Sequence, residues 1–260
     1  KLGAFYYRRG RYAEAVAAFG RVVALTPDNA RGYSNLGGAL IYLGDARGAV
    51  AALERSLELE PNYRAYNNLA IAYRRDGRLE DASRMYAEAL AINPRDYRVW
   101  GSLGSACRFL PGRAAEADSA FTRARALAEQ MLAVNPNDPE LLSLLAQYQV
   151  ELKDNAGARQ SLEKALTIAP DRADVLYFVS AAYEGLGDRE AALGAVAHLD
   201  DIPGLEHHGG DVRLAAVDLH VAVPHELAGG PARRGEAQPE NDIVEPAFQR
   251  LEERLAGDAA

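Results

Sequence analysis

Prolines recur along this chain at a nearly constant spacing, and this spacing constrains the fold more than any other feature. They are Pro27, Pro61, Pro94, Pro136 and Pro170, separated by 34, 33, 42 and 34 residues. Alanines stand twelve residues before these prolines, among them Ala15, Ala49, Ala82 and Ala158. Such a period indicates stacked copies of one supersecondary unit, because each unit needs its neighbours to bury its apolar face.

One period contains two helical patterns separated by a turn. In the second period, a first apolar face has the i, i+3, i+4, i+7 spacing of one side of a helix. Its residues are Tyr33, Leu36, Gly37 and Leu40. Gly44 interrupts this pattern, and a second stripe then runs through Ala49, Leu53 and Leu57. This second helix is expected to end near Pro61, because proline lacks an amide hydrogen and clashes with the preceding turn.

The combined pattern resembles the tetratricopeptide repeat. The matching Leu-small pairs are Leu36-Gly37, Leu69-Ala70 and Leu103-Gly104, each followed by the alanine and the proline of its period. The resemblance covers residues 1 to about 200 as about six units, the first of them truncated. It implies an all-α solenoid of helix-turn-helix repeats, with a superhelix over residues 1–203 and a separate C-terminal segment over residues 204–260.

The fourth unit is longer than the others, and seven of its additional residues follow Ala124. Seven residues make about two helical turns. Leu127, Met131 and Val134 continue the apolar stripe, so we predict an extended second helix that contacts a partner or a second copy of the chain. This long helix is similar to the repeat regions that accompany bacterial eukaryotic-type serine/threonine kinases, cyclases and transcriptional regulators.

After residue 200 the helical periodicity fades, and ten of the 41 residues from Asp200 to Glu240 are Gly or Pro. We expect residues 212–223 to form one helix that caps the last repeat. A short amphipathic helix is expected near the end of the chain, with the rest loosely held. The residues that predict this last helix are Val244, Phe248, Leu251 and Leu255.

The sequence contains no motif that predicts catalysis or a cofactor. It has no G-x-x-x-x-G-K phosphate-binding segment and no G-x-S-x-G nucleophile segment on a strand. His225-Glu226 would need a second histidine at position 229, which is Gly229. The tail histidines are expected to be solvated, with a metal site as the alternative; they are His207, His208, His220 and His225. Cys107 is expected to be a small buried hydrophobe. We therefore predict a protein that is not an enzyme and binds no metal or cofactor.

Composition narrows the range of partners and compartments. The net charge of -8 argues against general affinity for nucleic acid or anionic membranes, and no apolar run approaches the length of a membrane span. We expect a cytoplasmic location, with the periplasm as the alternative. Because the chain begins with Lys1 and no leader follows, the sequence is interpreted as a fragment.

A recurring set of polar and basic residues lies beside the packing face of the first helices. In stacked helix pairs these helices line a concave groove, and the candidate peptide-binding residues are Arg31, Asn35, Tyr42, Arg64, Asn67, Asn68, Arg74, Arg98 and Arg108. The resemblance implies that Asn35 and Asn68 hold the backbone of an extended peptide. Arginines pair with carboxylate or phosphate groups. In the fifth and sixth units Glu140, Glu151 and Asp174 reverse the sign of the charge.

The net charge is divided unequally along the chain. Residues 1 to 112 carry 16 Lys+Arg and 11 Asp+Glu, which is +5, whereas residues 113 to 260 carry 13 and 26, which is -13. We therefore predict a protein–protein interaction scaffold that binds an extended acidic or phosphorylated peptide in the groove of the first four units.

Several alternatives remain open at this stage. The chain could be the regulatory or substrate-positioning segment of a larger signalling enzyme, such as a serine/threonine kinase. The arginines could form a merely solvated face, or the acidic tail or neighbouring repeats could pair with them. RNA binding is disfavoured because stacking aromatics are few, and sugar-nucleotide transfer would need a catalytic domain that this sequence lacks.

Overall fold

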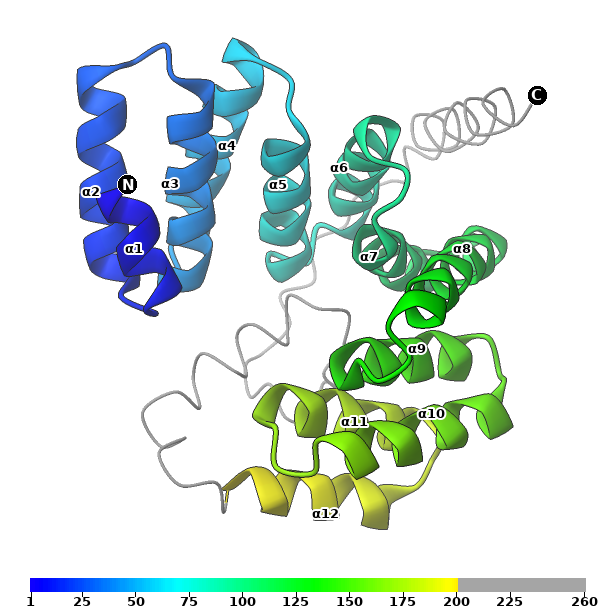
Figure 1. Ribbon diagram of the computed structural model, residues 1–260. Helices are drawn as coiled ribbons and strands as arrows, with labels where there is room; N and C mark the ends of the chain where they lie inside the picture. The colour runs from blue at the N-terminus through cyan, green and yellow to red at the C-terminus, as the bar shows by residue number, and fades with distance from the viewer. Residues whose placement is uncertain (201–260) are drawn as a thin grey trace. The chain divides into compact units, whose positions relative to one another are not determined.

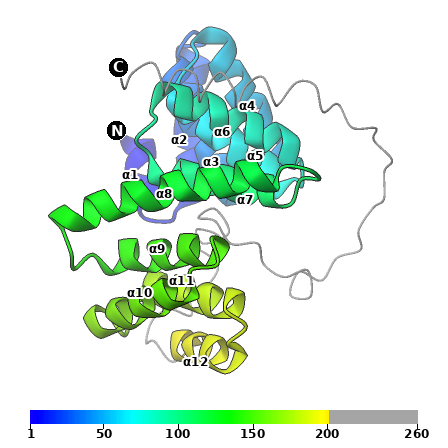
Figure 2. The same cartoon turned by 90° about the vertical axis from the view of Figure 1, so that its right-hand side faces the viewer.

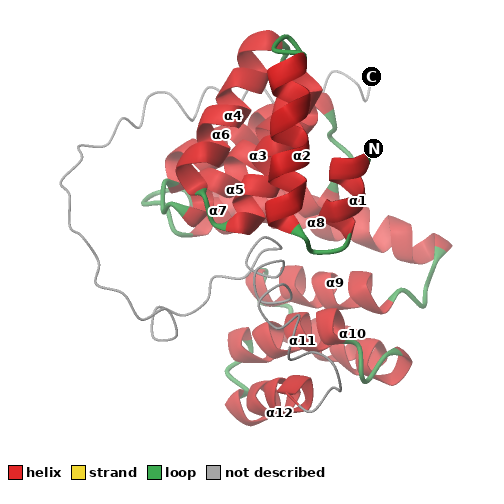
Figure 3. Ribbon diagram, turned by 90° about the vertical axis from the view of Figure 1, so that its left-hand side faces the viewer, coloured by secondary structure: helices red, strands yellow, loops and turns green. Residues whose placement is uncertain are grey.

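The computed structural model describes residues 1–200, with side chains up to His198, and in this part of the chain it is all helical (Figures 1 and 3). The described residues divide into two compact units, which we call unit 1 (residues 1–95) and unit 2 (residues 96–200). The predicted capping helix at 212–223 and the tail from 204 to 260 lie outside the described residues.

Unit 1 consists of three helix pairs. Their bounds are α1 (Leu2–Arg8) with α2 (Tyr12–Leu25), α3 (Ala30–Leu43) with α4 (Ala46–Leu59), and α5 (Tyr63–Arg75) with α6 (Leu79–Ile92). Besides the packing within each pair, α2 packs on α3, α4 packs on α5, and the first helices α3 and α5 are neighbours.

Unit 2 also consists of three helix pairs. Their bounds are α7 (Tyr97–Arg108) with α8 (Ala114–Val134), α9 (Pro139–Glu151) with α10 (Asn155–Ile168), and α11 (Ala173–Gly185) with α12 (Arg189–Asp200). The prediction of an all-α fold made of helix-turn-helix repeats is confirmed.

The repeated prolines and glycines mark the helix boundaries. Each second helix that precedes a repeated proline ends two residues before it, at Leu25, Leu59, Ile92, Val134 and Ile168. The turns inside the pairs use glycine in the left-handed region, for example Gly44 with φ of 85°. The fifth pair has Lys153 at the equivalent position, with φ of 64°. Lysine has a Cβ atom, so this left-handed conformation costs it more energy than it costs glycine.

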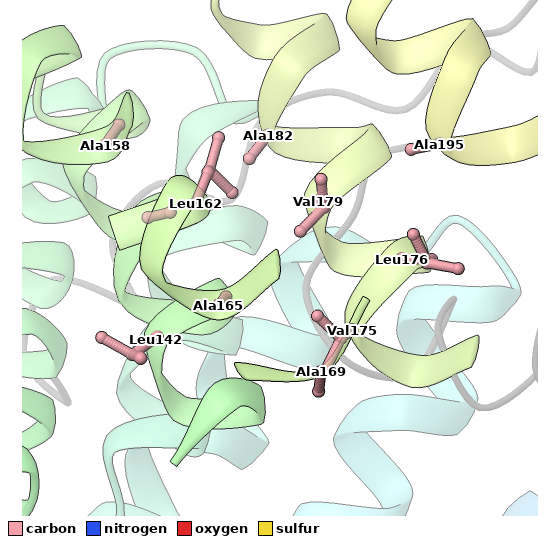
Figure 4. Packing of buried hydrophobic residues seen from close by; sticks show 11 residues of the cluster. Leu142, Ala158, Leu162, Ala165, Ala169, Val175, Leu176, Val179, Ala182 and Ala195 are labelled. Carbon is pink, nitrogen blue, oxygen red and sulfur yellow. The ribbon is translucent and has the colours of Figure 1, made fainter. Parts of the chain in front are cut away.

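Small residues allow the helices of a pair to approach closely. A Cβ atom added at Gly104 of α7 would lie 3.0 Å from the ring of Phe121 in α8. The alanine before each proline is fully buried in the same way, as at Ala49 and Ala158. In unit 2, α9, α10 and α11 enclose an aliphatic cluster that contains Leu142, Leu162 and Val179 (Figure 4).

A buried polar network fixes the start of α5 in unit 1. The Asn62 side chain accepts a hydrogen bond from the Ala65 amide (2.9 Å) and thereby caps α5. Its Nδ2 donates to Ser56 Oγ (3.2 Å), and the Ser56 hydroxyl lies 2.7 Å from that of Ser34 and donates to the Ala30 carbonyl (2.7 Å). The first turns of α3 and α5 are therefore held together through the end of α4.

The predicted extension of the fourth unit is present, since α8 has 21 residues where α6 and α10 have 14 (Figure 2). Its apolar stripe differs from the prediction. Leu127 is buried, but Met131 is 49% and Val134 is 88% exposed, because Leu132 is the residue of the last two turns that packs against the aliphatic cluster. None of the described helices is both long enough and apolar enough to cross a membrane.

Candidate functional site

The first helices α3, α5 and α7 share an arrangement at their N-termini. Arg31, Arg64 and Arg98 each occupy the second residue of their helix, and none of these helices has an acidic residue in its first turn. Each N-terminus is capped by an Asn or Asp side chain, as where Asn29 accepts from the Gly32 amide (2.8 Å). Because a helix N-terminus carries partial positive charge, an arginine placed there adds to a local positive potential.

The two of these arginines that belong to unit 1 are exposed to solvent. Arg31 and Arg64 are both exposed, and neither makes a hydrogen bond or an ion pair with any residue that the structure describes. Ion pairs of unit 1 join other arginines to residues three apart on one helix or its cap, such as Arg11 with Glu14 (2.5 Å) and Arg55 with Glu58 (2.8 Å). Arg31 and Arg64 therefore present two unneutralised positive charges on neighbouring helices.

The candidate asparagines of unit 1 have different roles. Asn68 lies beside Gly38, and its Nδ2 is 3.5 Å from the Ser34 carbonyl, so its side chain spans from α5 to α3. Asn35 and Asn67 are half-buried and make no hydrogen bond with a described residue. Each of these two amides therefore has a donor and an acceptor available to a ligand.

At the opposite end of the first helices, three rings form a group that we call the tyrosine cluster, consisting of Tyr7, Tyr12 and Tyr42. Tyr12 stacks on Tyr42 with centroids 4.9 Å apart, and Tyr7 meets Tyr42 edge to face at 5.4 Å. Arg75 lies over the Tyr42 ring and donates to the Ile41 carbonyl (2.6 Å). Tyr42 therefore packs within unit 1, and the candidate Arg74 on α5 is half-buried.

In unit 2 the candidate arginines are neutralised by carboxylates of the next helix pair and, for Arg108, also by one from its own pair. Arg98 Nη2 lies 2.6 Å from Glu140 Oε1, and Arg108 contacts Glu151 (Nε to Oε2, 3.0 Å) and Asp118 (Nη2 to Oδ1, 2.7 Å). Burial lowers the pKa of Arg98, but its contacts with Tyr97 and Glu140 raise it, and the net shift is upward. The alternative that neighbouring repeats pair with the arginines therefore holds for Arg98 and Arg108.

Arg98 and Glu140 are both predicted from the sequence as groove residues, but their ion pair is not. Glu140 is the second residue of α9, as Arg98 is of α7, so aligning the repeats position by position would have placed the opposite charges together. The tyrosine cluster was not predicted, because Tyr12 belongs to a second helix and carries no signal in the first-helix pattern.

The remaining chemically active side chains fit structural roles. Cys107 is fully buried, and burial raises the pKa of its thiol to about 12, as expected for a small hydrophobe. Among the described residues, no three His, Cys, Asp or Glu side chains are grouped so that they could hold a metal ion. The four tail histidines named above lie outside these residues.

Family models match most of the described chain. A model described as TPR repeat matches residues 3–44, and two described as tetratricopeptide repeat match residues 28–95 and 109–173.

Among curated proteins, the chain is 50% identical over 52 residues to the Hsp70-Hsp90 organizing protein of Triticum aestivum, covering 20% of this chain and 9% of that protein. It is 39% identical over 85 residues to the TPR repeat-containing thioredoxin TTL4 of Arabidopsis thaliana, covering 32% of this chain and 12% of that protein. It is 27% identical over 204 residues to DnaJ homolog subfamily C member 3 of Rattus norvegicus, covering 75% of this chain and 40% of that protein. The chain thus spans less than half the length of each of these relatives.

Solved structures share the fold. The type IV pilus biogenesis factor PilW superimposes with a TM-score of 0.55 at 21% identity, covering 78% of this chain and 91% of PilW. TTC0263, a thermophilic TPR protein of Thermus thermophilus, superimposes with a TM-score of 0.53 at 22% identity, covering 73% of this chain and 98% of TTC0263. At these identities the likeness extends to the fold alone.

Proposed function

The chain belongs to the tetratricopeptide repeat family, a scaffold type that binds protein partners, and we propose that it binds an extended peptide with acidic or phosphorylated side chains across α3 and α5 of unit 1. Arg31 and Arg64 pair with the anionic groups of the peptide. Asn35 and Asn67 bind its backbone. Asn68 lies beside this site, Tyr42 and Arg74 lie in the last turns of the same two helices, and Arg98 and Arg108 serve the internal packing of unit 2.

One observation carries this proposal. The arginine at the second residue of a first helix is paired with a carboxylate in unit 2, whereas in unit 1 it has no carboxylate partner among the described residues. In unit 2 the second residues of α7 and α9 have opposite charges and lie in ion-pair contact, Arg98 with Glu140. In unit 1 the second residues of α3 and α5 are both arginine, so these two neighbouring helices present like charges at this position. An anion supplied by a ligand neutralises these charges and takes the place that Glu140 has in unit 2.

The two amides complement these charges. A peptide group offers one donor and one acceptor, and an asparagine side chain can satisfy both regardless of the ligand's sequence. Asn35 follows Arg31 by four residues on α3, and Asn67 follows Arg64 by three on α5, so each amide lies about one turn after an arginine. Backbone binding by the amides and anion binding by the guanidinium groups together select an extended acidic segment.

The name of one relative supports a protein as the ligand. The Hsp70-Hsp90 organizing protein, by its name, acts on two proteins, and it matches this chain over 52 residues. We infer from this that the ligand of the present chain is also a polypeptide, without transferring those partners to it.

The test is a double charge reversal with a matched control. In the full chain, Arg31→Glu with Arg64→Glu is expected to weaken binding of acidic peptides at least about tenfold, which corresponds to about 1.4 kcal/mol. The control, Arg21→Glu with Arg47→Glu, makes the same change of charge at exposed residues of the second helices α2 and α4. It is expected to leave affinity unchanged within about twofold.

Binding is measured by fluorescence anisotropy with a library of labelled ten-residue peptides that carry Glu, phosphoserine or Ser at matched positions. Circular dichroism establishes that both variants keep their helical content. Preference for phosphoserine over Glu identifies a phosphorylated ligand, and equal binding identifies an acidic one. Equal affinity of the wild-type chain and the Arg31/Arg64 variant for every peptide, or binding of none, overturns the proposal.

A second candidate function is a regulatory segment of a larger enzyme. It is favoured by the lengths of the relatives, since the chain spans 12% of a thioredoxin-type protein and 40% of a DnaJ homolog. Sequencing the surrounding gene tests this candidate, because a catalytic domain in the same open reading frame supports it and further repeats alone contradict it.

A further inference from the structure

We propose that residues 236–245 of this chain are an internal ligand of unit 1, which binds Arg31 and Arg64 and competes with the partner peptide. This inference rests on the proposed function, because it assigns to the same site a competitor supplied by the chain itself. Its consequence is regulation: the affinity for an external partner depends on whether this segment is displaced.

The C-terminal residues and unit 1 carry opposite net charges. Residues 201 to 260 carry 5 Lys+Arg and 12 Asp+Glu, a net charge of -7, whereas residues 1 to 95 carry 14 and 10, a net charge of +4. Within the acidic tail, residues 236–245 contain four carboxylates and no Lys or Arg. The carboxylates are those of Glu236, Glu240, Asp242 and Glu245. This stretch therefore has the composition that we propose for the external peptide.

Two carboxylates of unit 1 pair with arginines close to them in the sequence. Asp81 pairs with Arg78 (2.5 Å) and with Arg84 on the same stretch of chain, as Glu14 pairs with Arg11. These local pairs leave Arg31 and Arg64 without a partner among the described residues. Any acidic group that pairs with these two arginines is therefore supplied by a segment outside the described residues or by another molecule.

The connection to this segment is long. Asp200 at the end of α12 and Glu236 are separated by 35 residues, which reach about 120 Å when fully extended; when the helix predicted at 212–223 caps the last repeat, the 12 residues after it reach about 40 Å. A tethered segment of this kind acts at an effective concentration of the order of 1 mM when its tether can span the distance. If the isolated segment binds with a Kd of about 0.1 mM, tethering weakens an external competitor by about tenfold.

The experiment uses the full chain and one defined probe, a fluorescein-labelled synthetic peptide with the sequence of residues 236–245. The test variant replaces the four carboxylates of the segment by amides (Glu236→Gln, Glu240→Gln, Asp242→Asn, Glu245→Gln). The control variant neutralises four other tail carboxylates, by Glu226→Gln, Glu252→Gln, Glu253→Gln and Asp258→Asn. Both variants change the net charge by the same amount.

The test variant is expected to bind the probe about tenfold more tightly than the wild-type chain, and the control variant within about twofold of wild type. Adding Arg31→Glu and Arg64→Glu to the test variant is expected to abolish this gain. Raising the salt concentration is expected to reduce the gain, because exposed charges are screened.

Two outcomes overturn the inference in distinguishable ways. If the probe binds the wild-type chain and the test variant equally, and this binding depends on Arg31 and Arg64, the internal ligand is absent while the proposed function stands. If the probe binds none of the variants, the segment is not a ligand of unit 1, and the peptide library then decides the proposed function independently.

Discussion

Replacing Gly101 by alanine tests how α7 and α9 are held together in unit 2. A Cβ atom at Gly101 would lie 2.5 Å from Tyr148 Cε1 and 2.9 Å from Tyr148 Oη. Carbon atoms pack at about 3.5 to 4.0 Å, so the ring or the helix has to move by about 1 Å. Tyr148 is fully buried, and its hydroxyl donates to the Tyr97 carbonyl (3.3 Å), so the ring has little room to move.

Overpacking of this kind costs about 1 to 3 kcal/mol. A Gly→Ala change inside a helix also contributes about 0.5 to 1 kcal/mol of stability through helix propensity. Gly194 of α12 separates the two effects, because a Cβ atom there has no neighbour within 4 Å. The expected result is that Gly101→Ala is less stable than Gly194→Ala by about 1 to 3 kcal/mol.

Trp100 makes the measurement local to unit 2. It is the single tryptophan of the chain, it is 3% exposed, and it precedes Gly101 on α7. Urea unfolding of the full chain, followed by the fluorescence of this residue, gives the free energy of unfolding of each variant.

A double-mutant cycle with Tyr148→Leu identifies the cause. In the Tyr148→Leu background the ring is absent, and Gly101→Ala is expected to lose most of its cost. The reasoning is refuted if Gly101→Ala is as stable as Gly194→Ala, or if its cost is the same with and without the Tyr148 ring.

Two further predictions concern Lys153 and Cys107. Lys153→Gly is expected to stabilise unit 2 by about 1 kcal/mol, because glycine adopts φ of 64° without the Cβ strain that lysine has there; an unchanged or lower urea midpoint in the Trp100 assay contradicts this. Cys107 is expected to resist iodoacetamide in the native protein between pH 7 and 9, because it is fully buried and its pKa is raised to about 12. The urea-unfolded chain is expected to react faster as pH rises through the ordinary thiol pKa of about 8.5, and native alkylation with that same pH profile would show that the thiol is accessible.

Much of the fold was predictable because its signals are local. The prolines after α4 and α6 and the glycine between α3 and α4 act through backbone geometry, which is encoded within a few residues of each position. The additional turns of α8 were predictable from a count of residues. The exposure of Met131 and Val134 was not, because an apolar spacing shows which face a residue occupies but not whether another helix covers that face.

The site was predictable only in part, for a related reason. That Arg31, Arg64 and Arg98 occupy equivalent positions follows from the repeat. Which of them is neutralised depends on the side chain at the same position of the next pair and on the reach between helices. The contact of Asn68 with the Ser34 carbonyl is likewise a property of helix packing, so its equivalence to Asn35 in sequence did not give the two residues equal roles.

The pairing of Arg98 with Glu140 also bears on the engineering of repeat proteins. The second residue of the first helix joins two adjacent pairs of unit 2 through this ion pair. Under the proposed function, exchanging arginine and glutamate at this residue alone would open or close a ligand site in an engineered array, with the buried alanines and glycines left unchanged.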